Sequence, residues 1–386
     1  MNVVFLSPHF PPNFWPFCVR LREAGHTVLG LADAEFDQLH PELRYALTEY
    51  YKVSDLHNYQ ELVRALGYFT HKYGKLDRLE SMSEYWLETE AMLRQDFNIF
   101  GLRPEDMSHI KRKSVMKQYF QLAGLRVARG KVCRTAVEAQ DFVEEVGYPV
   151  VAKPDIGVGA AKTYKINNDA ELMDYIATKP PVEYILEEFV PGRVITYDGL
   201  TDLQGRVVFD SSLEYSRGVM DVVNEDTDIY YYMVREIAED LREAGRKVAK
   251  TFNVLERFFH FEFFRLEDGS LVALEVNMRP PGGLSIDMFN YANDMDIFKE
   301  WVNVLTHGTV GEQARHPYFC TYVGRKDHIH YKRSHQQVML EFGPLVAHHE
   351  PISGIFAGAI GNYGYILRHP ELSPMLRAAQ AIQERA

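Results

Sequence analysis

The chain opens with apolar runs that alternate with a helical pattern. Val3 to Leu6 is a short apolar run with β-branched residues, which predicts a buried strand. After a proline-rich loop, Val19 to Ala24 has a helical pattern that Gly25 ends, and His26 to Leu31 is a second apolar run. This order of strand, helix and strand indicates a doubly wound α/β unit at the N-terminus.

Helical and strand patterns continue along the rest of the chain. Ser108 to Ala123 is predicted to be one helix, Thr135 to Val146 a second, and Thr227 to Phe252 a long third. After Pro317 the pattern is β-like and ends in a helix from Pro374 to Arg385. The strands predicted between these helices are 148–154, 163–166, 184–190, 194–197 and 207–209. The pattern therefore predicts a mixed α/β and α+β protein.

A hairpin from Phe258 to Arg279 places polar residues on one face. Asp268 and Gly269 between two apolar runs form a two-residue turn signal, and a turn of that length sets the register of the strands. In this register Glu262 faces Glu275, and His260 faces Asn277. All four side chains then point to the same side, because they lie two residues apart along each strand.

The opposed glutamates of this hairpin require an explanation. Two carboxylates held side by side need a cation or a shared proton. Glu262, Glu275 and the amide oxygen of Asn277 form a hard oxygen site suited to Mg²⁺, with substrate phosphates as its other ligands. Arg279 follows the second strand and can bind a phosphate or carboxylate through two hydrogen bonds. The alternative is a solvent-facing strand pair that tolerates its glutamates.

A small-residue loop follows the strand that ends in Lys153. It contains Gly157, Gly159 and Lys162 and lacks the GxxxxGK-[ST] pattern. Backbone N–H groups of such a loop can bind phosphates, and Lys153 can reach one from the strand end. An ordinary hairpin loop is the alternative. A further strand, 184–190, ends in two acids and can hydrogen-bond an adenine through its edge, unless those acids are merely solvated.

Composition narrows the range of functions. The 386 residues are 46% hydrophobic and 25% charged, with a net charge of −12, which disfavours a general nucleic-acid binder. The three cysteines lie far apart, so neither a zinc knuckle nor a disulfide framework is indicated. The sequence has neither a signal-peptide pattern nor a membrane-spanning apolar window, so we expect a cytoplasmic protein without membrane or nucleic-acid partners.

In their order along the chain, these segments resemble the ATP-grasp superfamily, most specifically over residues 109–283. The segment from Lys111 to Lys117 is similar to the family's first lysine segment, with Lys113 the better match. Gly147 to Pro154 is similar to its second lysine strand, and Glu187 to Val190 to its adenine hinge. The resemblance implies an ATP-grasp fold, with ATP between a lid and a central antiparallel sheet.

The resemblance also implies a division of the chain and a set of site residues. The units are a Rossmann-like pre-ATP-grasp domain at 1–107, a first ATP-grasp part with the lid at 108–190, a central part with the metal site at 191–310, and a C-terminal β-rich subdomain at 311–386. The implied nucleotide-binding residues are Lys113, Lys153, Gly157, Gly159, Lys162, Glu187, Glu188 and Val190. The implied metal ligands, for Mg²⁺ or alternatively Mn²⁺, are Glu262, Glu275 and Asn277. Arg279 and Lys153 are the implied catalytic residues.

The family's common reaction activates a carboxylate as an acyl-phosphate, which an amine then attacks. Arg279 is followed by Gly282 and Gly283, a segment that resembles the carboxylate–amine ligase branch, with carbamoyl phosphate synthase as another similar branch. Asp287 lies just beyond these glycines and is a further candidate substrate contact. Asp198 and Tyr215 are two more, for which plain polar loop residues are the alternative. The expected partners are a small carboxylate and an amine, and a homodimer fits the family. A kinase that phosphorylates a hydroxyl and a non-catalytic nucleotide-binding module remain alternatives.

Overall fold

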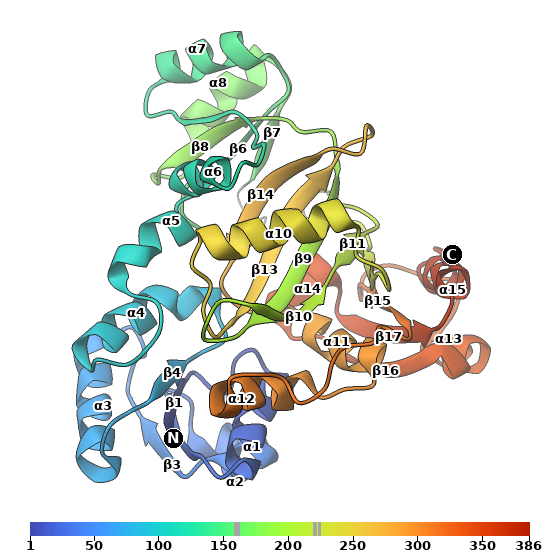
Figure 1. Cartoon of the computed structure of the whole chain (residues 1–386). Coiled ribbons are helices and arrows are strands. Elements are labelled where there is room, and N and C mark those ends of the chain that lie inside the picture. Colours follow the sequence, from blue (N-terminus) through green and yellow to red (C-terminus); the bar gives the residue numbers. More distant parts are fainter. Residues whose placement is uncertain (158–162, 219–221, 223–224) are drawn as a thin grey trace.

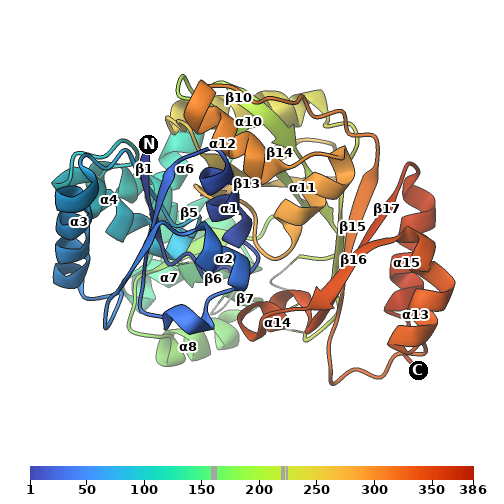
Figure 2. The ribbon, with the colours of Figure 1, turned by 90° about the horizontal axis from the view of Figure 1, so that it is seen from below.

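A computed structural model describes residues 1–157, 163–218, 222 and 225–386 of the chain. In this part of the chain the strands form three sheets. Figure 1 shows the N-terminal sheet at one end, a small sheet with two helices at the other, and the largest sheet between them. Figure 2 shows the two chain ends on opposite sides of the molecule. Three predicted positions fall in the gaps or beside them, and two of these, Gly159 and Lys162, lie outside the described residues.

The N-terminal unit is a parallel sheet of order β3-β2-β1-β4. Its strands are β1 Asn2–Leu6, β2 Thr27–Ala32, β3 Glu49–Lys52 and β4 Arg78–Glu80. Its helices are α1 Trp15–Glu23, α2 Pro41–Ala46, α3 Tyr59–Tyr73 and α4 Leu87–Asp96. The apolar runs β1 and β2 are almost fully buried, as expected for parallel strands covered on both faces. The predicted α/β unit is therefore confirmed.

A small antiparallel sheet of order β5-β8-β6-β7 forms the second unit. Its elements are β5 Gly130–Val132, α7 Ala136–Val146, β6 Val150–Pro154, β7 Tyr164–Ile166, α8 Asp169–Thr178 and β8 Tyr184–Glu188. Thr135 caps α7 in a capping box with Glu138, which explains why this helix begins where the sequence predicts. Figure 1 shows α7 and α8 on the side of this sheet that faces away from the rest of the molecule.

The central sheet has the order β14-β13-β9-β11-β12-β15-β17-β16, and β10 pairs with β9. Its strands are β9 Arg193–Thr201, β10 Val207–Ser211, β11 Leu213–Tyr215, β12 Tyr230–Met233, β13 Phe258–Arg265, β14 Leu271–Asn277, β15 Phe319–Arg325, β16 Val346–Pro351 and β17 Tyr363–His369. Its helices are α10 Glu239–Thr251, α11 Ser285–Asn293, α12 Ile297–His307, α13 His335–Phe342, α14 Gly354–Ile360 and α15 Leu372–Ile382. The strands of residues 311–386 thus extend the central sheet, so the predicted boundary at 310 does not separate two sheets.

Helix α10 covers one face of this sheet, as Figure 1 shows. Leu241, Ala244 and Val248 recur at helical spacing and pack against the phenylalanines of β13. Gly245 lets the helix approach β9 closely, because a Cβ atom there would lie 2.0 Å from the Tyr197 ring. This packed layer fixes the strands from behind and leaves their other face for the polar residues of the hairpin.

Two predicted helices differ in the structure. The helix predicted from Ser108 to Ala123 is two helices, α5 Met107–Lys111 and α6 Lys113–Leu122, because Arg112 adopts an extended conformation between them. The helix predicted from Thr227 to Phe252 begins only at Glu239, and its first part is strand β12. The tyrosine run of β12 favours a strand by its intrinsic propensity, and pairing with β11 and β15 satisfies its backbone.

The hairpin between β13 and β14 has the predicted pairing of its polar residues, although its turn is not the predicted two-residue turn. Glu262 pairs with Glu275 and His260 with Asn277, as predicted. The turn is longer by one residue, since the Leu266 N–H donates to the Ser270 carbonyl. A β-bulge next to Glu275 compensates for this extra residue. The two offsets cancel, and the polar face is preserved.

Candidate functional site

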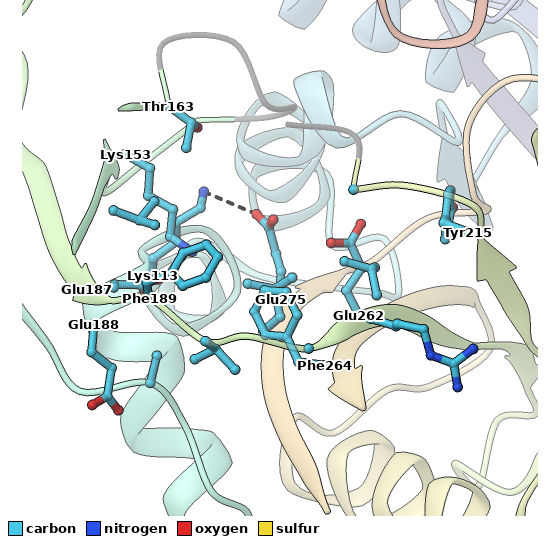
Figure 3. Close-up of a pocket in the computed structure, with 18 of the residues that line it drawn as sticks. Lys113, Lys153, Thr163, Glu187, Glu188, Phe189, Tyr215, Glu262, Phe264 and Glu275 are labelled. Atoms are coloured by element: carbon cyan, nitrogen blue, oxygen red, sulfur yellow. Dashed lines mark ion pairs between the residues drawn. The ribbon is translucent and has the colours of Figure 1, made fainter. Parts of the chain in front are cut away.

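A cavity of about 390 Å³ lies between the small sheet and the central sheet. Its size falls in the range of small-molecule sites. Lysines of the small-sheet side and carboxylates of the hairpin line it, as Figure 3 shows. The predicted residues that line it are Lys113, Lys153, Gly157, Glu187, Glu188, Val190, Tyr215, Glu262, Glu275, Asn277 and Arg279. The fold thus brings most of the predicted residues to one cavity.

Glu187 lies between two buried lysines. Its carboxylate is 2.8 Å from the Lys153 ammonium and 2.8 Å from that of Lys117. Lys153 and Glu187 share a face because Val151, two residues before Lys153, pairs directly with Glu187. Burial alone would raise the pKa of Glu187, but the two ammonium groups outweigh it and lower this pKa to about 2. Glu187 is therefore an anionic anchor that holds both lysines at the cavity wall.

Lys113 reaches the cavity because of the helix break at Arg112. The Arg112 guanidinium lies 2.9 Å from the Asp155 carboxylate, and the Lys113 N–H donates to the Asp155 carbonyl. The Asp155 carboxylate also accepts from the N–H of Ser114, which caps the new helix from outside its own segment. The Lys113 ammonium then lies 3.1 Å from Glu275 and donates to the Gly157 carbonyl at 2.9 Å. This ion pair is the dashed line in Figure 3.

The hairpin carboxylates are oriented by a hydrogen-bonded chain. The imidazole of His260 bonds to Asp198 through Nδ1 at 2.5 Å and to Glu262 through Nε2 at 3.2 Å. Burial would lower the pKa of His260, but the Asp198 carboxylate raises it to about 9, so the imidazole is protonated and donates at both nitrogens. Desolvation would raise the pKa of Glu262, whereas His260 lowers it. Glu262 is therefore an oriented anion at the cavity wall.

The donor set of the hairpin fits a hard divalent cation. Glu262, Glu275 and Asn277 offer only oxygen atoms from one face, and Figure 3 shows the two carboxylates pointing the same way. Mg²⁺ binds few protein carboxylates and completes its shell with water and phosphate oxygens. Among the described residues no three histidine, cysteine, aspartate or glutamate side chains form a metal-binding group. Two carboxylates and an amide would fill only part of the coordination shell of such a cation, and substrate oxygens or water would have to supply the remaining ligands.

Arg279 stands at the end of β14, beside these oxygen atoms. Its guanidinium donates to the Pro280 carbonyl at 2.7 Å and approaches the Asn277 amide oxygen at 3.5 Å. The guanidinium lines the cavity, so it is held next to the predicted metal position. A planar group with several donors in this position can bind an oxyanion there.

The predicted substrate contacts do not all lie in this cavity. Tyr215 lines it, whereas Asp198 is fully buried beneath His260 and acts on the site through that imidazole. Asp287 accepts from the Asn13 amide at 2.8 Å, and the same amide donates to the Gly283 carbonyl at 3.1 Å. Burial raises the pKa of Asp287 to about 6. Gly282 directly precedes this cluster, which joins the N-terminal unit to α11 and lies outside the cavity lining.

Sequence reasoning gave no separate role to several residues that shape the site. Lys117 follows Lys113 by four residues, and this spacing on a helix was the available signal for a second lysine. Asp155 and Phe189 carried no such signal, because the cap that Asp155 supplies and the wall that Phe189 forms depend on tertiary packing. The hinge is also more constrained than predicted, since the Glu188 N–H donates to the Arg129 carbonyl at 2.9 Å.

Comparison with known proteins places this geometry in a class. Residues 146–287 match the family model of the ATP-grasp domain. A solved L-amino acid ligase from Bacillus licheniformis superposes with a TM-score of 0.76 at 15% identity, over 100% of this chain and 98% of that one. N5-carboxyaminoimidazole synthetase from Staphylococcus aureus, solved with ADP, gives a TM-score of 0.75 at 15% identity, over 99% and 97%. The chain contains an ATP-grasp domain and has the ATP-grasp fold, which confirms the predicted fold class.

Relatives found by sequence include an amino acid ligase and carbamoyl phosphate synthases. An L-arginine-specific L-amino acid ligase from Bacillus subtilis is 24% identical over 243 residues, which are 60% of this chain and 58% of that protein. The carbamoyl phosphate synthase large chain of Xylella fastidiosa is 23% identical over 224 residues, 56% of this chain and 21% of that one. The chain therefore matches only part of the length of these relatives. No helix among the described residues is long and apolar enough to cross a membrane.

Proposed function

We propose that the protein is an ATP- and Mg²⁺-dependent ligase that joins a small-molecule carboxylate to an amine. The carboxylate oxygen attacks the γ-phosphorus of ATP, the bond to the ADP oxygen breaks, and an acyl-phosphate forms. The amine then attacks the carbonyl carbon, the C–O bond to phosphate breaks, and the amine loses a proton. The observation that carries the proposal is the oxygen face of Glu262, Glu275 and Asn277 opposite the buried lysines of the same cavity.

We assign the charged groups of the cavity the following roles in this reaction. Lys113 and Lys153 neutralise phosphate oxygens, and Glu187 keeps Lys153 in place. Glu262, Glu275 and Asn277 on the face of β13 and β14 would hold Mg²⁺, which would supply positive charge for the phosphoryl group. Arg279 faces the same group from the end of β14. The proposed phosphate-binding residues also include Gly159 and Lys162, which lie outside the described residues.

Phosphate release with defined substrate pairs tests the proposal. We expect the purified chain to release phosphate from ATP only with Mg²⁺ and with one class of carboxylate and amine, and to form the amide as detected by mass spectrometry. A stable phosphorylated product without an amine would identify a kinase instead. Tight ATP binding without turnover across a broad panel of acids and amines would identify a binding module. Amino acids are the first panel, because the relatives named above include amino acid ligases.

Lys153→Ala is expected to weaken ATP binding and turnover together. The ammonium is buried beside Glu187 and lines the cavity, so its loss removes a phosphate contact and leaves Glu187 with Lys117 alone. Charge-assisted hydrogen bonds of this kind contribute about 1.5–3 kcal/mol, which corresponds to roughly 10- to 100-fold in affinity. Calorimetric titration with ATP measures the change. Unaltered ATP affinity in this variant would remove Lys153 from the proposed nucleotide site.

A further inference from the structure

Met278 lies between two residues of the proposed site, Asn277 and Arg279, and its N–H and carbonyl belong to the two peptide groups that join it to them. Met278 is fully buried, and both its polar backbone groups are bonded to charged side chains. Its carbonyl accepts from Nε and Nη2 of Arg257 at 3.1 and 2.9 Å. Its N–H donates to the Glu84 carboxylate at 3.2 Å. The direction in which Asn277 and Arg279 leave these peptide groups therefore depends on two side chains outside the hairpin.

Glu84 belongs to the N-terminal unit, 194 residues before its partner. It follows β4 after a turn in which Met82 adopts a φ of 56°, a left-handed conformation that is uncommon for a residue with a side chain. The Ser83 N–H donates to the Ser81 hydroxyl at 3.2 Å, and Ser81 is fully buried, which holds this turn in place. Such conformations persist where the surrounding structure enforces them, and they gather at functional sites. Here the turn delivers a carboxylate to the hairpin.

The surroundings of Glu84 contain charges of both signs. Its side chain is only 6% exposed, and burial raises its pKa, while the Arg279 and Lys111 cations oppose this rise and Glu275 adds to it. The carboxylate therefore has one hydrogen bond to the end of β14, to the Met278 N–H, and the Arg279 cation acts on it electrostatically.

Arg257 cannot replace Glu84 in this arrangement. Arg257 directly precedes β13, so it fixes the Met278 carbonyl from within the central sheet. Its guanidinium lies 3.9 Å from Glu80, another acid of the N-terminal unit. The Met278 N–H, in contrast, is bonded to Glu84. Loss of Glu84 would leave this buried donor unsatisfied and would remove the side-chain anchor of the peptide group between Asn277 and Met278, because Arg257 binds only the following peptide group, between Met278 and Arg279.

We propose that Glu84 is a positioning residue through which the N-terminal unit sets the orientation of Asn277 and Arg279 toward the phosphates of Mg²⁺-bound ATP. The proposal rests on the proposed function, since it assigns an ATP phosphate site to these two residues. It gives the N-terminal unit a role in nucleotide chemistry although that unit contributes no residue to the described cavity lining. Lys153, Glu187 and the hinge belong to the other side of the cavity, so we expect Glu84 to affect the Mg²⁺-dependent part of ATP binding more than metal-free binding.

A matched pair of variants separates the hydrogen bond from the filling of space. Glu84→Met keeps the length and volume of the side chain and removes the acceptor, whereas Glu84→Gln keeps an oxygen that can accept from the Met278 N–H. The control is Glu88→Gln, because Glu88 lies four residues further on in α4 and pairs with Lys111 on the surface at 3.3 Å. For each protein, calorimetric titration gives the dissociation constant of ATP with and without Mg²⁺, and steady-state assays give kcat and KM.

We expect Glu84→Met to bind metal-free ATP within about twofold of wild type and to lose the tightening that Mg²⁺ brings. Substitution of residues behind metal ligands typically changes metal affinity or activity by about 10- to 100-fold, and kcat of Glu84→Met should fall by this factor while KM for the carboxylate and the amine stays near wild type. Glu84→Gln should recover most of the Mg²⁺ effect. Glu88→Gln should match wild type in both measurements.

Three results would overturn the positioning role. One is a Glu84→Met protein with unaltered Mg²⁺ tightening and kcat. Another is an equal loss of metal-free and Mg²⁺-dependent ATP binding, which indicates general destabilisation. If Glu84→Met does not fold, Glu84→Gln decides, and a full loss of the Mg²⁺ effect in that variant would exclude the hydrogen bond as the cause. A wild-type chain that binds no ATP would instead refute the proposed function. Because this result comes from the wild type and not from a Glu84 variant, it is distinct from the three results that concern the positioning role.

Discussion

Glu275→Gln is expected to lower turnover by at least about 10²–10³-fold, the range found when one group that stabilises transition-state charge is removed. Glu275 combines two contacts in the site. It faces Glu262 across the hairpin and lies 3.1 Å from the Lys113 ammonium. The amide is nearly isosteric but carries no charge, so it binds Mg²⁺ weakly and no longer attracts the lysine. The half-saturating Mg²⁺ concentration should rise along with the loss of kcat, which a Mg²⁺ titration of phosphate release measures.

The control for this variant is Glu267→Gln. It makes the same chemical change in the same hairpin, but Glu267 lies in the exposed turn, away from the carboxylate pair. Its kcat and its Mg²⁺ dependence should equal those of wild type. Wild-type Mg²⁺-dependent turnover in Glu275→Gln would show that the hairpin does not hold the metal, and the proposed roles of Glu262 and Asn277 would fall with it.

The hairpin shows how far the sequence could predict this site. Alternation along two strands was enough to place Glu262, Glu275 and Asn277 on one face, because period-two geometry is a local property. The turn length and the bulge beside Glu275 were not predictable, since the alternating pattern of the sequence marks neither of them. The predicted pairing is confirmed only because these two offsets cancel. A single unrecognised offset would have moved one glutamate to the other face.

Elements whose boundaries are set by distant partners were harder to predict. A helical pattern runs without interruption through Arg112, but the ion pairs of Arg112 with Asp155 and Glu183 hold it in an extended conformation. Likewise, the tyrosines of β12 were assigned to the helix that follows them, although β15 pairs with them from about 90 residues away. In both cases tertiary contacts override the local pattern.

The chemistry that connects these elements was beyond sequence reasoning for the same reason. Glu84 and Arg257 have ordinary sequence neighbourhoods, and only the fold brings them to the backbone of Met278. Lys117 had a signal in its spacing from Lys113, but its pairing with Glu187 also depends on the fold. The motif residues were found because their order along the chain resembles a family. Their roles in binding and catalysis remain predictions that the variants described above test.

Glu187→Gln is expected to destabilise the metal-free, nucleotide-free protein by about 3–5 kcal/mol, the typical effect of removing one partner from a buried ion pair. The carboxylate is the shared counter-ion of Lys153 and Lys117, and all three side chains are at most 11% exposed. Burial already lowers the pKa of Lys117, and Glu187 opposes this effect. Without Glu187 the pKa of Lys117 should therefore fall further. Denaturant unfolding at neutral pH, followed by circular dichroism, measures the change in the midpoint.

The lowered pKa of Glu187 also predicts how the stability of the protein changes with pH. The pKa of Glu187 is lowered from 4.5 to about 2 on folding, so the folded chain holds this proton less tightly than the unfolded chain. The stabilisation is therefore complete above pH 4.5 and is lost as the pH falls toward 2, and this part of the acid loss should be absent in Glu187→Gln. Glu188→Gln is the control, because the adjacent Glu188 pairs with the half-exposed Arg129 and should change stability by less than about 1 kcal/mol. Equal effects of the two substitutions would mean that the buried lysines do not depend on Glu187 for their charge.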